Sequence, residues 1–259
     1  MNDNRNTIRC ENSSRIRKQG ITVAVCLLLS FFMLISFSPL SMAAEVSTFA
    51  GGEIDGHGQS FSFLGVDLTS RINKTVAVSG RIIPNYLTYT YYSGDKEIKA
   101  YSPGIFAVAG IKLFWDQTMF GVFGGGEFRD TTLHPDDTNS SIRGNTSAGL
   151  IQGEFDSWLP SKTNLNAFAS YSGTNNFLYE KARIKQQITN LDFKKEYSFL
   201  VGLEQFIGRN ADFQENGFGL AVELYNIPLK ISVALRSGFK HDSTFGNGIY
   251  WGLDLYKGF

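Results

Sequence analysis

Cysteine is nearly absent from this sequence. The chain of 259 residues has two cysteines, Cys10 and Cys26, and both lie close to its start. The rest of the chain can therefore form no disulfide, offers no thiol nucleophile and supplies no cysteine ligand to a metal. Its stability must come from a large core or from a closed sheet.

Proline and net charge are also scarce. The sequence has 6 prolines, whereas aromatic residues make up 14% of it and glycine contributes 27 residues. This composition favours many strands and tight turns over helices. The 24 basic residues balance the 24 acidic ones. A formal net charge of zero supplies no bulk attraction to nucleic acid, so we expect no nucleic-acid partner.

A long apolar run occurs at one place, from Ile21 to Phe37. Ser38-Pro39 ends the run, and the small residues Ser41 and Ala43 follow. Before it stand five basic residues, Arg5, Arg9, Arg15, Arg17 and Lys18. Together these features are typical of a secretory signal peptide, so we predict a cleaved signal at residues 1–44 and a mature domain at residues 45–259. The alternative is a retained membrane anchor, because the run is close to the lower spanning limit of about 17 residues.

Beyond the predicted signal, apolar and polar residues alternate. Leu229 to Arg236 shows the pattern, with apolar residues at odd positions and Lys230, Ser232 and Arg236 among the even ones. Such alternation predicts a strand with one apolar face, and no long 3.6-residue period competes with it. About twelve strands are expected, at residues 47–54, 59–69, 75–92, 98–114, 118–129, 142–158, 163–173, 177–188, 195–206, 216–225, 229–239 and 246–259.

The connections between these strands differ in length. Those after even-numbered strands are mostly short, whereas those after odd-numbered strands are longer and more polar, such as residues 130–141, 208–215 and 240–245. An even number of strands with this asymmetry is typical of a bacterial outer-membrane barrel. We therefore predict an all-β protein, an antiparallel transmembrane β-barrel of about 12 strands in the bacterial outer membrane. A soluble sandwich or lipocalin-like barrel is the alternative.

The end of the chain supports the outer-membrane prediction. Ile249, Trp251 and Leu253 share one face of the last predicted strand, and the sequence ends at Phe259. A terminal Phe after this alternation resembles the signal that the outer-membrane assembly machinery recognises. Lys257 departs from that signal, which usually has an aromatic residue there.

Two segments change phase. Polar residues stand at odd positions from residue 143 to 147 and at even positions after Ile151, while Phe61 and Phe63 give way to Val66 and Leu68. A one-residue slip of this kind predicts a β-bulge near Leu150 and another between residues 61 and 68.

If the apolar faces meet lipid, the polar faces line the interior. Lys181, Arg183 and Lys185 alternate on one such face, next to Tyr179. They are candidates for binding an acidic or sugar-like solute. Alternatively, opposite charges pair across strands and fill the interior. Arg236 is also assigned to this face, and Arg236→Ser is expected to cost much less stability than an Arg on the apolar face.

Residues that could carry catalysis are few. The three histidines, His57, His134 and His241, lie in predicted loops. His241-Asp242-Ser243 has the residue types of a hydrolase triad, but consecutive side chains alternate in direction and cannot act on one another. The acidic pair after His134 lacks the spacing of a calcium loop and is expected to form a turn. We expect no catalytic residue, no cofactor and no metal site.

The central segment, residues 124–172, resembles the cellulose biosynthesis protein BcsS family. The matching positions are Gly126-Glu127, Asp130, Pro135-Asp136-Asp137, Asn139, Arg143-Gly144, Gly149, Glu154 and Ala169-Ser170-Tyr171. Weaker likeness extends over most of the chain after the signal. The resemblance implies an accessory of bacterial cellulose or exopolysaccharide production, as in biofilms, and not the synthase. It carries no catalytic residue over to this chain.

The function expected from the sequence is therefore non-enzymatic. The partners would be outer-membrane lipid, the assembly machinery and a cellulose-like polysaccharide or its export machinery. Candidate binding residues are Asp136, Asp137, Asn139 and Arg143 in a loop, and Lys181, Arg183 and Lys185 inside. Two alternatives remain: an oligosaccharide-specific outer-membrane channel, and a lipid- or glycan-modifying barrel enzyme that would use His241.

Overall fold

The computed structural model describes residues 44–188 and 196–259. The predicted signal peptide, except for its last residue, lies outside the described residues. The strands are β1 (Ala44–Asp55), β2 (Ser60–Arg71), β3 (Val76–Ser93), β4 (Lys96–Trp115), β5 (Thr118–His134), β6 (Gly144–Trp158), β7 (Thr163–Ser172), β8 (Phe177–Ile188), β9 (Tyr197–Arg209), β10 (Gln214–Asn226), β11 (Ile231–Asp242) and β12 (Gly246–Gly258).

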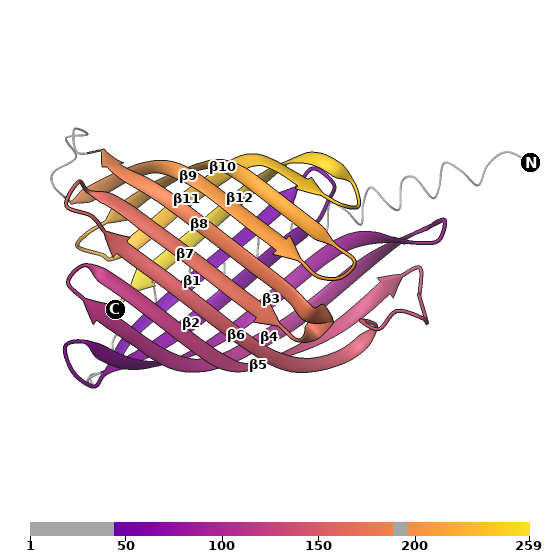
Figure 1. The fold of residues 1–259 in the computed structure, drawn as a ribbon, viewed down its shortest axis with the longest axis horizontal. Helices are drawn as coiled ribbons and strands as arrows, with labels where there is room; N and C mark the ends of the chain where they lie inside the picture. Colours follow the sequence, from indigo (N-terminus) through magenta and orange to yellow (C-terminus); the bar gives the residue numbers. More distant parts are fainter. Residues whose placement is uncertain (1–43, 189–195) are drawn as a thin grey trace, which may run out of the picture. The chain divides into compact units, whose positions relative to one another are not determined.

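These strands form one closed antiparallel barrel (Figure 1). Each strand pairs with the next in the chain, and β1 closes the barrel on β12 from Ser47 opposite Gly258 to Asp55 opposite Tyr250. Closure leaves no sheet edge with unpaired backbone groups. The predicted all-β barrel of about 12 strands is confirmed, and the sandwich alternative is wrong, because the strands make a single sheet.

The two faces of the sheet have opposite character. Leu235, Phe239 and Trp251 point outward and are 62%, 75% and 64% exposed, whereas Arg236 and Glu204 point inward and are 4% and 1% exposed. A soluble protein would bury the first group and expose the second. An apolar exterior around a polar interior is the arrangement of a barrel whose surroundings are lipid. No helix in the described part of the chain is long and apolar enough to cross a membrane.

Most connections are shorter than the sequence predicted. The predicted loops at 208–215 and 240–245 shrink to residues 210–213 and 243–245, because β9, β10 and β11 continue to pair beyond their expected ends. The loop between β5 and β6, residues 135–143, stays long. The end of the barrel that carries these three connections is called the loop end below, and the opposite end, with Ala44 and the C-terminus, the turn end.

Neither predicted bulge exists. The β5–β6 register runs without a break from Thr118 opposite Ser157 to Thr131 opposite Gly144, and the β1–β2 register is also continuous. Ser147 and its polar neighbour Asn145 point outward near the loop end, where the exterior need not be apolar. At the other site two aromatic side chains face inward.

These inward aromatics are Phe61 and Phe63 of β2. The Phe63 ring centroid lies 6.1 Å from that of Phe49, and a Cβ on Gly51 would come within 2.7 Å of the Phe63 ring. Gly51 therefore leaves room for an aromatic side chain inside the barrel. The polar–apolar pattern therefore changes phase for two reasons, neither of which is a slip in strand pairing. Polar residues face outward near the loop end of β6, and aromatic residues face inward on β2.

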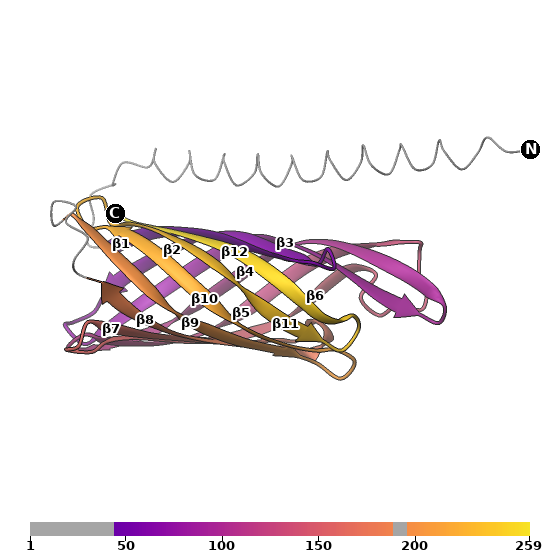
Figure 2. The ribbon, with the colours of Figure 1, turned by 90° about the horizontal axis from the view of Figure 1, so that it is seen from above.

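Three neighbouring strands extend farther than the rest. β3, β4 and β5 have 18, 20 and 17 residues, and they project beyond the other strands at the loop end in both ribbon views (Figures 1 and 2). Ile98, Ala100 and Leu133 form a small buried apolar cluster there, against which Tyr89 and Tyr91 pack. This extension positions the 135–143 loop.

Candidate functional site

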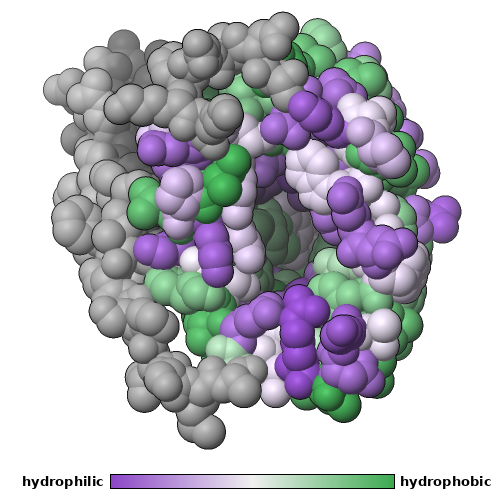
Figure 3. Space-filling view, turned by 90° about the vertical axis from the view of Figure 1, so that its left-hand side faces the viewer, coloured by the Kyte–Doolittle hydropathy of each residue, from purple (hydrophilic) through white to green (hydrophobic). Residues whose placement is uncertain are grey.

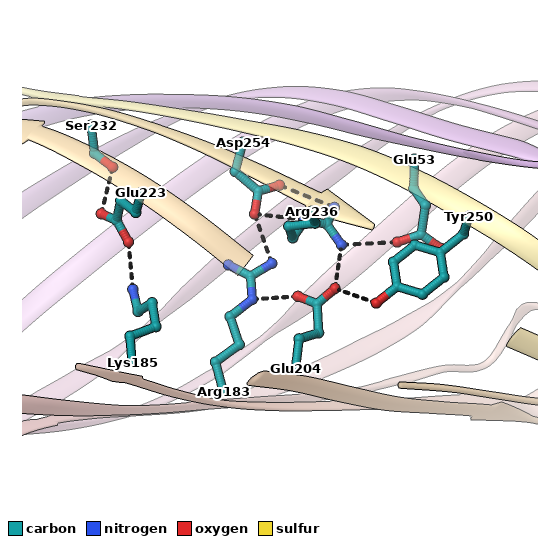
Figure 4. Close-up of polar contacts among 9 residues, drawn as sticks. All are labelled: Glu53, Arg183, Lys185, Glu204, Glu223, Ser232, Arg236, Tyr250 and Asp254. Atoms are coloured by element: carbon teal, nitrogen blue, oxygen red, sulfur yellow. Dashed lines mark hydrogen bonds and ion pairs between the residues drawn. The ribbon is translucent and has the colours of Figure 1, made fainter. Parts of the chain in front are cut away.

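The barrel interior contains a network of charged side chains. Arg183 of β8 donates through Nε to Glu204 Oε2 at 2.5 Å and through Nη2 to Asp254 Oδ2 of β12 at 2.7 Å. Strands β8 and β12 are separated by three others. Figure 4 shows that side chains from β8 and β9 on one wall meet side chains from β11 and β12 on the facing wall. The network therefore crosses the interior, and its residues lie near the middle of their strands.

Arg236 of β11 lies at the centre of this network. Its Nη1 donates to Glu53 Oε2 at 2.9 Å and to Glu204 Oε1 at 3.0 Å, and its Nε lies 3.2 Å from Asp254 Oδ2. Tyr250 donates its hydroxyl to the same Glu204 oxygen at 3.0 Å. One buried guanidinium thus contacts three carboxylates, which is the compensation that buried charges require.

A second charged cluster lies on the other side of the barrel. Arg81 of β3 bridges Asp67 of β2 and Glu154 of β6, with its Nη2 2.7 Å from Glu154 Oε1. Lys112 adds a second cation 2.9 Å from Asp67 Oδ2. The Arg81 guanidinium also lies over the Phe123 ring, 3.9 Å from its centroid. Of the charged residues in this cluster, the sequence had singled out Glu154 alone, as a position that matches the family motif. Asp67, Arg81 and Lys112 also stand at alternate polar positions on strands, which is the same signal.

The three cations of β8 were candidates for binding a solute, with pairing to opposite charges as the alternative, and two of them are paired with carboxylates. Arg183 is held by two carboxylates, and Lys185 Nζ lies 2.6 Å from Glu223 Oε2. Lys181 has no ion-pair partner among the described residues. Because most interior cations are neutralised locally, the interior presents no continuous positive surface to a solute. Figure 3 shows the turn end of the barrel, which is hollowed at its centre.

The predicted loop motif is an ordered turn. Arg143 donates two hydrogen bonds to Asp136, from Nε to Oδ1 at 2.6 Å and from Nη2 to Oδ2 at 2.9 Å. Asp137 accepts from the backbone N–H of Asn139 and from the Tyr91 hydroxyl, both at 3.2 Å. Hydrogen bonding from Arg143 lowers the pKa of the Asp136 carboxyl. The side chains of Arg143 and Asp136 are 49% and 53% exposed, so the loop presents a fixed pattern of charge to solvent.

The two predicted groups of binding residues are thus separate. Asp136, Asp137, Asn139 and Arg143 lie on the loop between β5 and β6, and residues 181–185 lie on β8 inside the barrel. A role in binding stays a prediction for both groups.

Sequence comparison identifies the family. The sequence matches the family described as cellulose biosynthesis protein BcsS over residues 36–259. This chain belongs to the BcsS family. The resemblance noted from the central motif is confirmed, and it extends over the whole barrel. No curated protein matches the chain.

Solved structures resemble the BcsS-family barrel in fold alone. The translocator domain of the autotransporter NalP from Neisseria meningitidis has a TM-score of 0.50 and 11% identity, with 96% of this chain and 97% of that chain covered. An outer membrane channel from Pseudomonas putida F1 has a TM-score of 0.50 and 9% identity, with 87% and 98% covered. At identities this low the likeness shows a shared fold and does not indicate what this chain does.

His241, the histidine considered for catalysis in this BcsS-family chain, does not belong to the charged network inside the barrel. His241 points outward on β11, and its Nδ1 lies 2.9 Å from Asn247 Oδ1. Asp242 is buried on the opposite face. The two side chains therefore cannot act together, as the alternation of strand side chains predicted.

Proposed function

We propose that this BcsS-family barrel is a non-enzymatic accessory of bacterial cellulose or related exopolysaccharide production, located in the outer membrane. It would serve as a docking or assembly factor for the polymer or its export machinery. Family membership over residues 36–259 supports the link to cellulose. The apolar exterior of a closed barrel supports the location.

The interior network is the observation that favours docking over chemistry or passage. Arg183, Glu204 and Arg236 are bound to one another or to neighbouring carboxylates. A charged side chain held in such ion pairs is unlike a general acid or base, which must be able to exchange a proton with a substrate. Recognition then falls to the loop end, where exposed loops can carry contacts on a rigid scaffold.

Replacing Asp136 and Asp137 by Ala should lower extracellular cellulose while leaving the barrel folded. The loop projects from the barrel and its ion pair is exposed, so its removal should affect stability little. We would complement a strain that lacks the gene with wild type or with the double variant. Glucan assay would report polymer, and heat-modifiable gel mobility in isolated outer membranes would report folding and location.

The matched control replaces Asp95 and Asp212, two exposed aspartates in other connections of the loop end, by Ala. This control should leave cellulose at the wild-type level. If the Asp136 and Asp137 variant makes as much extracellular cellulose as wild type, or if the control loses as much cellulose as the variant, the loop has no part in the proposed function. If deleting the gene leaves the amount of cellulose unchanged, the proposed function is wrong.

The hollow at the turn end favours one second candidate, an oligosaccharide channel. Because the network crosses the interior, we expect low single-channel conductance from wild type in planar bilayers. Replacing both Arg183 and Asp254 by Ala removes one ion pair from the network that crosses the interior, and it should raise the conductance several-fold. A wild type that already conducts as well as the variant, with block by added oligosaccharide, would favour the channel over the docking factor.

A further inference from the structure

Two connections meet at the loop end of the seam between β1 and β12. The β1–β2 connection starts after Asp55 and contains His57, and the β11–β12 connection starts after Asp242. The seam itself extends to the Gly56 N–H, which donates to the Ile249 carbonyl at 2.9 Å. The His57 ring packs 5.2 Å, centroid to centroid, from Phe245. This packing places His57 between two aspartates that are far apart in sequence.

Each aspartate uses one oxygen to hold its own turn. Asp55 Oδ1 accepts from the backbone N–H groups of His57 and Gln59, both at 2.9 Å. Asp242 Oδ1 accepts from the backbone N–H groups of Thr244 and Phe245, at 2.9 and 2.6 Å. The second oxygen of each carboxylate is not used by its own turn.

These second oxygens face His57. Asp55, His57 and Asp242 each offer one ligand atom, and these three atoms lie within 4.8 Å of one another. His57 Nδ1 is 3.6 Å from Asp242 Oδ2. Asp55 Oδ2, Asp242 Oδ2 and His57 Nδ1 are all buried, and none has a hydrogen-bond partner in the described part of the chain. The Asp242 side chain has no exposed surface. Buried polar atoms are nearly always partnered, and of these three only Asp55 Oδ2 has a cation in contact, the Lys240 ammonium. His57 Nδ1 and Asp242 Oδ2 therefore indicate a missing ligand.

The charge around this point is also unbalanced. Lys240 Nζ lies 2.8 Å from Asp55 Oδ2, outside hydrogen-bond geometry, and 2.9 Å from Glu215 Oε2. Three carboxylates, of Asp55, Glu215 and Asp242, thus share one ammonium, which leaves two negative charges. A protonated His57 would offset one of them. A divalent cation would offset both while leaving the imidazole neutral, which is the form that binds metals.

We propose that Asp55, His57 and Asp242 bind a divalent metal ion of the zinc class. One imidazole nitrogen and two carboxylate oxygens form a ligand set that Zn²⁺ accepts, with water completing the coordination. Zinc requires its ligands at about 2.0–2.2 Å, so the ligand atoms of a tetrahedral site lie about 3.4 Å apart. The 3.6 Å between His57 Nδ1 and Asp242 Oδ2 is close to that separation. The bound ion joins the β1–β2 connection to the β11–β12 connection, at the one seam of the barrel formed by strands distant in sequence.

Calorimetric titration with ZnCl₂ tests this site on the mature barrel, purified without a histidine tag and folded in detergent. Wild type should bind one Zn²⁺ per barrel. His57→Gln and Asp242→Asn should each weaken the affinity at least tenfold. Asn at position 242 keeps an oxygen that can accept from Thr244 and Phe245, so the turn is retained while a charged ligand is lost. Heat-modifiable mobility would show that each variant is folded.

His241→Ala is the matched control, because His241 lies next to Asp242 in sequence but points outward. It should bind Zn²⁺ as wild type does. The proposal is overturned if wild type takes up no stoichiometric Zn²⁺, which would leave His57 and Asp242 as a simple ion pair. It is equally overturned if the His57 and Asp242 variants bind as wild type does, or if His241→Ala abolishes binding.

Discussion

Leu235→Arg is expected to destabilise the barrel by about 2–4 kcal/mol. Leu235 points outward from the middle part of β11, and neighbouring outward positions on β10 and β12 are also apolar. An arginine there must place its guanidinium in lipid, where it has neither water nor a counter-charge. Urea-dependent folding into lipid vesicles, followed by tryptophan fluorescence, would measure the change in free energy of unfolding.

Leu229→Arg is the matched control. Leu229 is an equally exposed leucine, but it lies in the turn between β10 and β11 at the end of the barrel. The cost of a cation falls to about 0–1 kcal/mol near the membrane interface. Equal costs at the two positions would mean that the outward face of β11 does not meet lipid, and the membrane-spanning assignment would then be lost.

Arg236→Met is expected to destabilise the barrel by about 3–5 kcal/mol, the cost of leaving buried partners uncompensated. Arg236 contacts Glu53, Glu204 and Asp254. Its removal leaves Glu53 without an ion-pair partner among the described residues, and leaves Glu204 and Asp254 to share Arg183. The sequence alone predicted that losing this arginine costs much less stability than placing an arginine on the apolar face. The structure changes that expectation, because the guanidinium is buried among its partners.

Two further variants separate the network from a general effect of losing arginine. Arg71→Met removes an exposed arginine whose Nε lies 3.0 Å from Glu45 Oε1, and it should change stability little. Adding Glu204→Gln to Arg236→Met should recover part of the loss, because it removes one of the negative charges that are then in excess around Arg183. A double-mutant cycle with no coupling between positions 204 and 236 would contradict the network.

The sequence by itself determined the class of fold, the number of strands and the two faces of the sheet. These follow from a period of two residues, which is a local property that each strand displays alone, as Ile231 to Arg236 does. The family likewise followed from local motifs around Pro135 and Arg143. Even the ion pair between Arg143 and Asp136 could be anticipated, because the two residues lie on one loop.

Only the tertiary structure decided which inward residues meet. Arg183 reaches Asp254, and His57 reaches Asp242, across separations in sequence that no local pattern spans. Such contacts depend on the tilt and register of every strand around the closed barrel. Strand ends were decided in the same way: β9, β10 and β11 continue past their apolar segments because the neighbouring backbone is there to pair with. Alternation assigns a side chain to the interior, and closure of the barrel selects its partner.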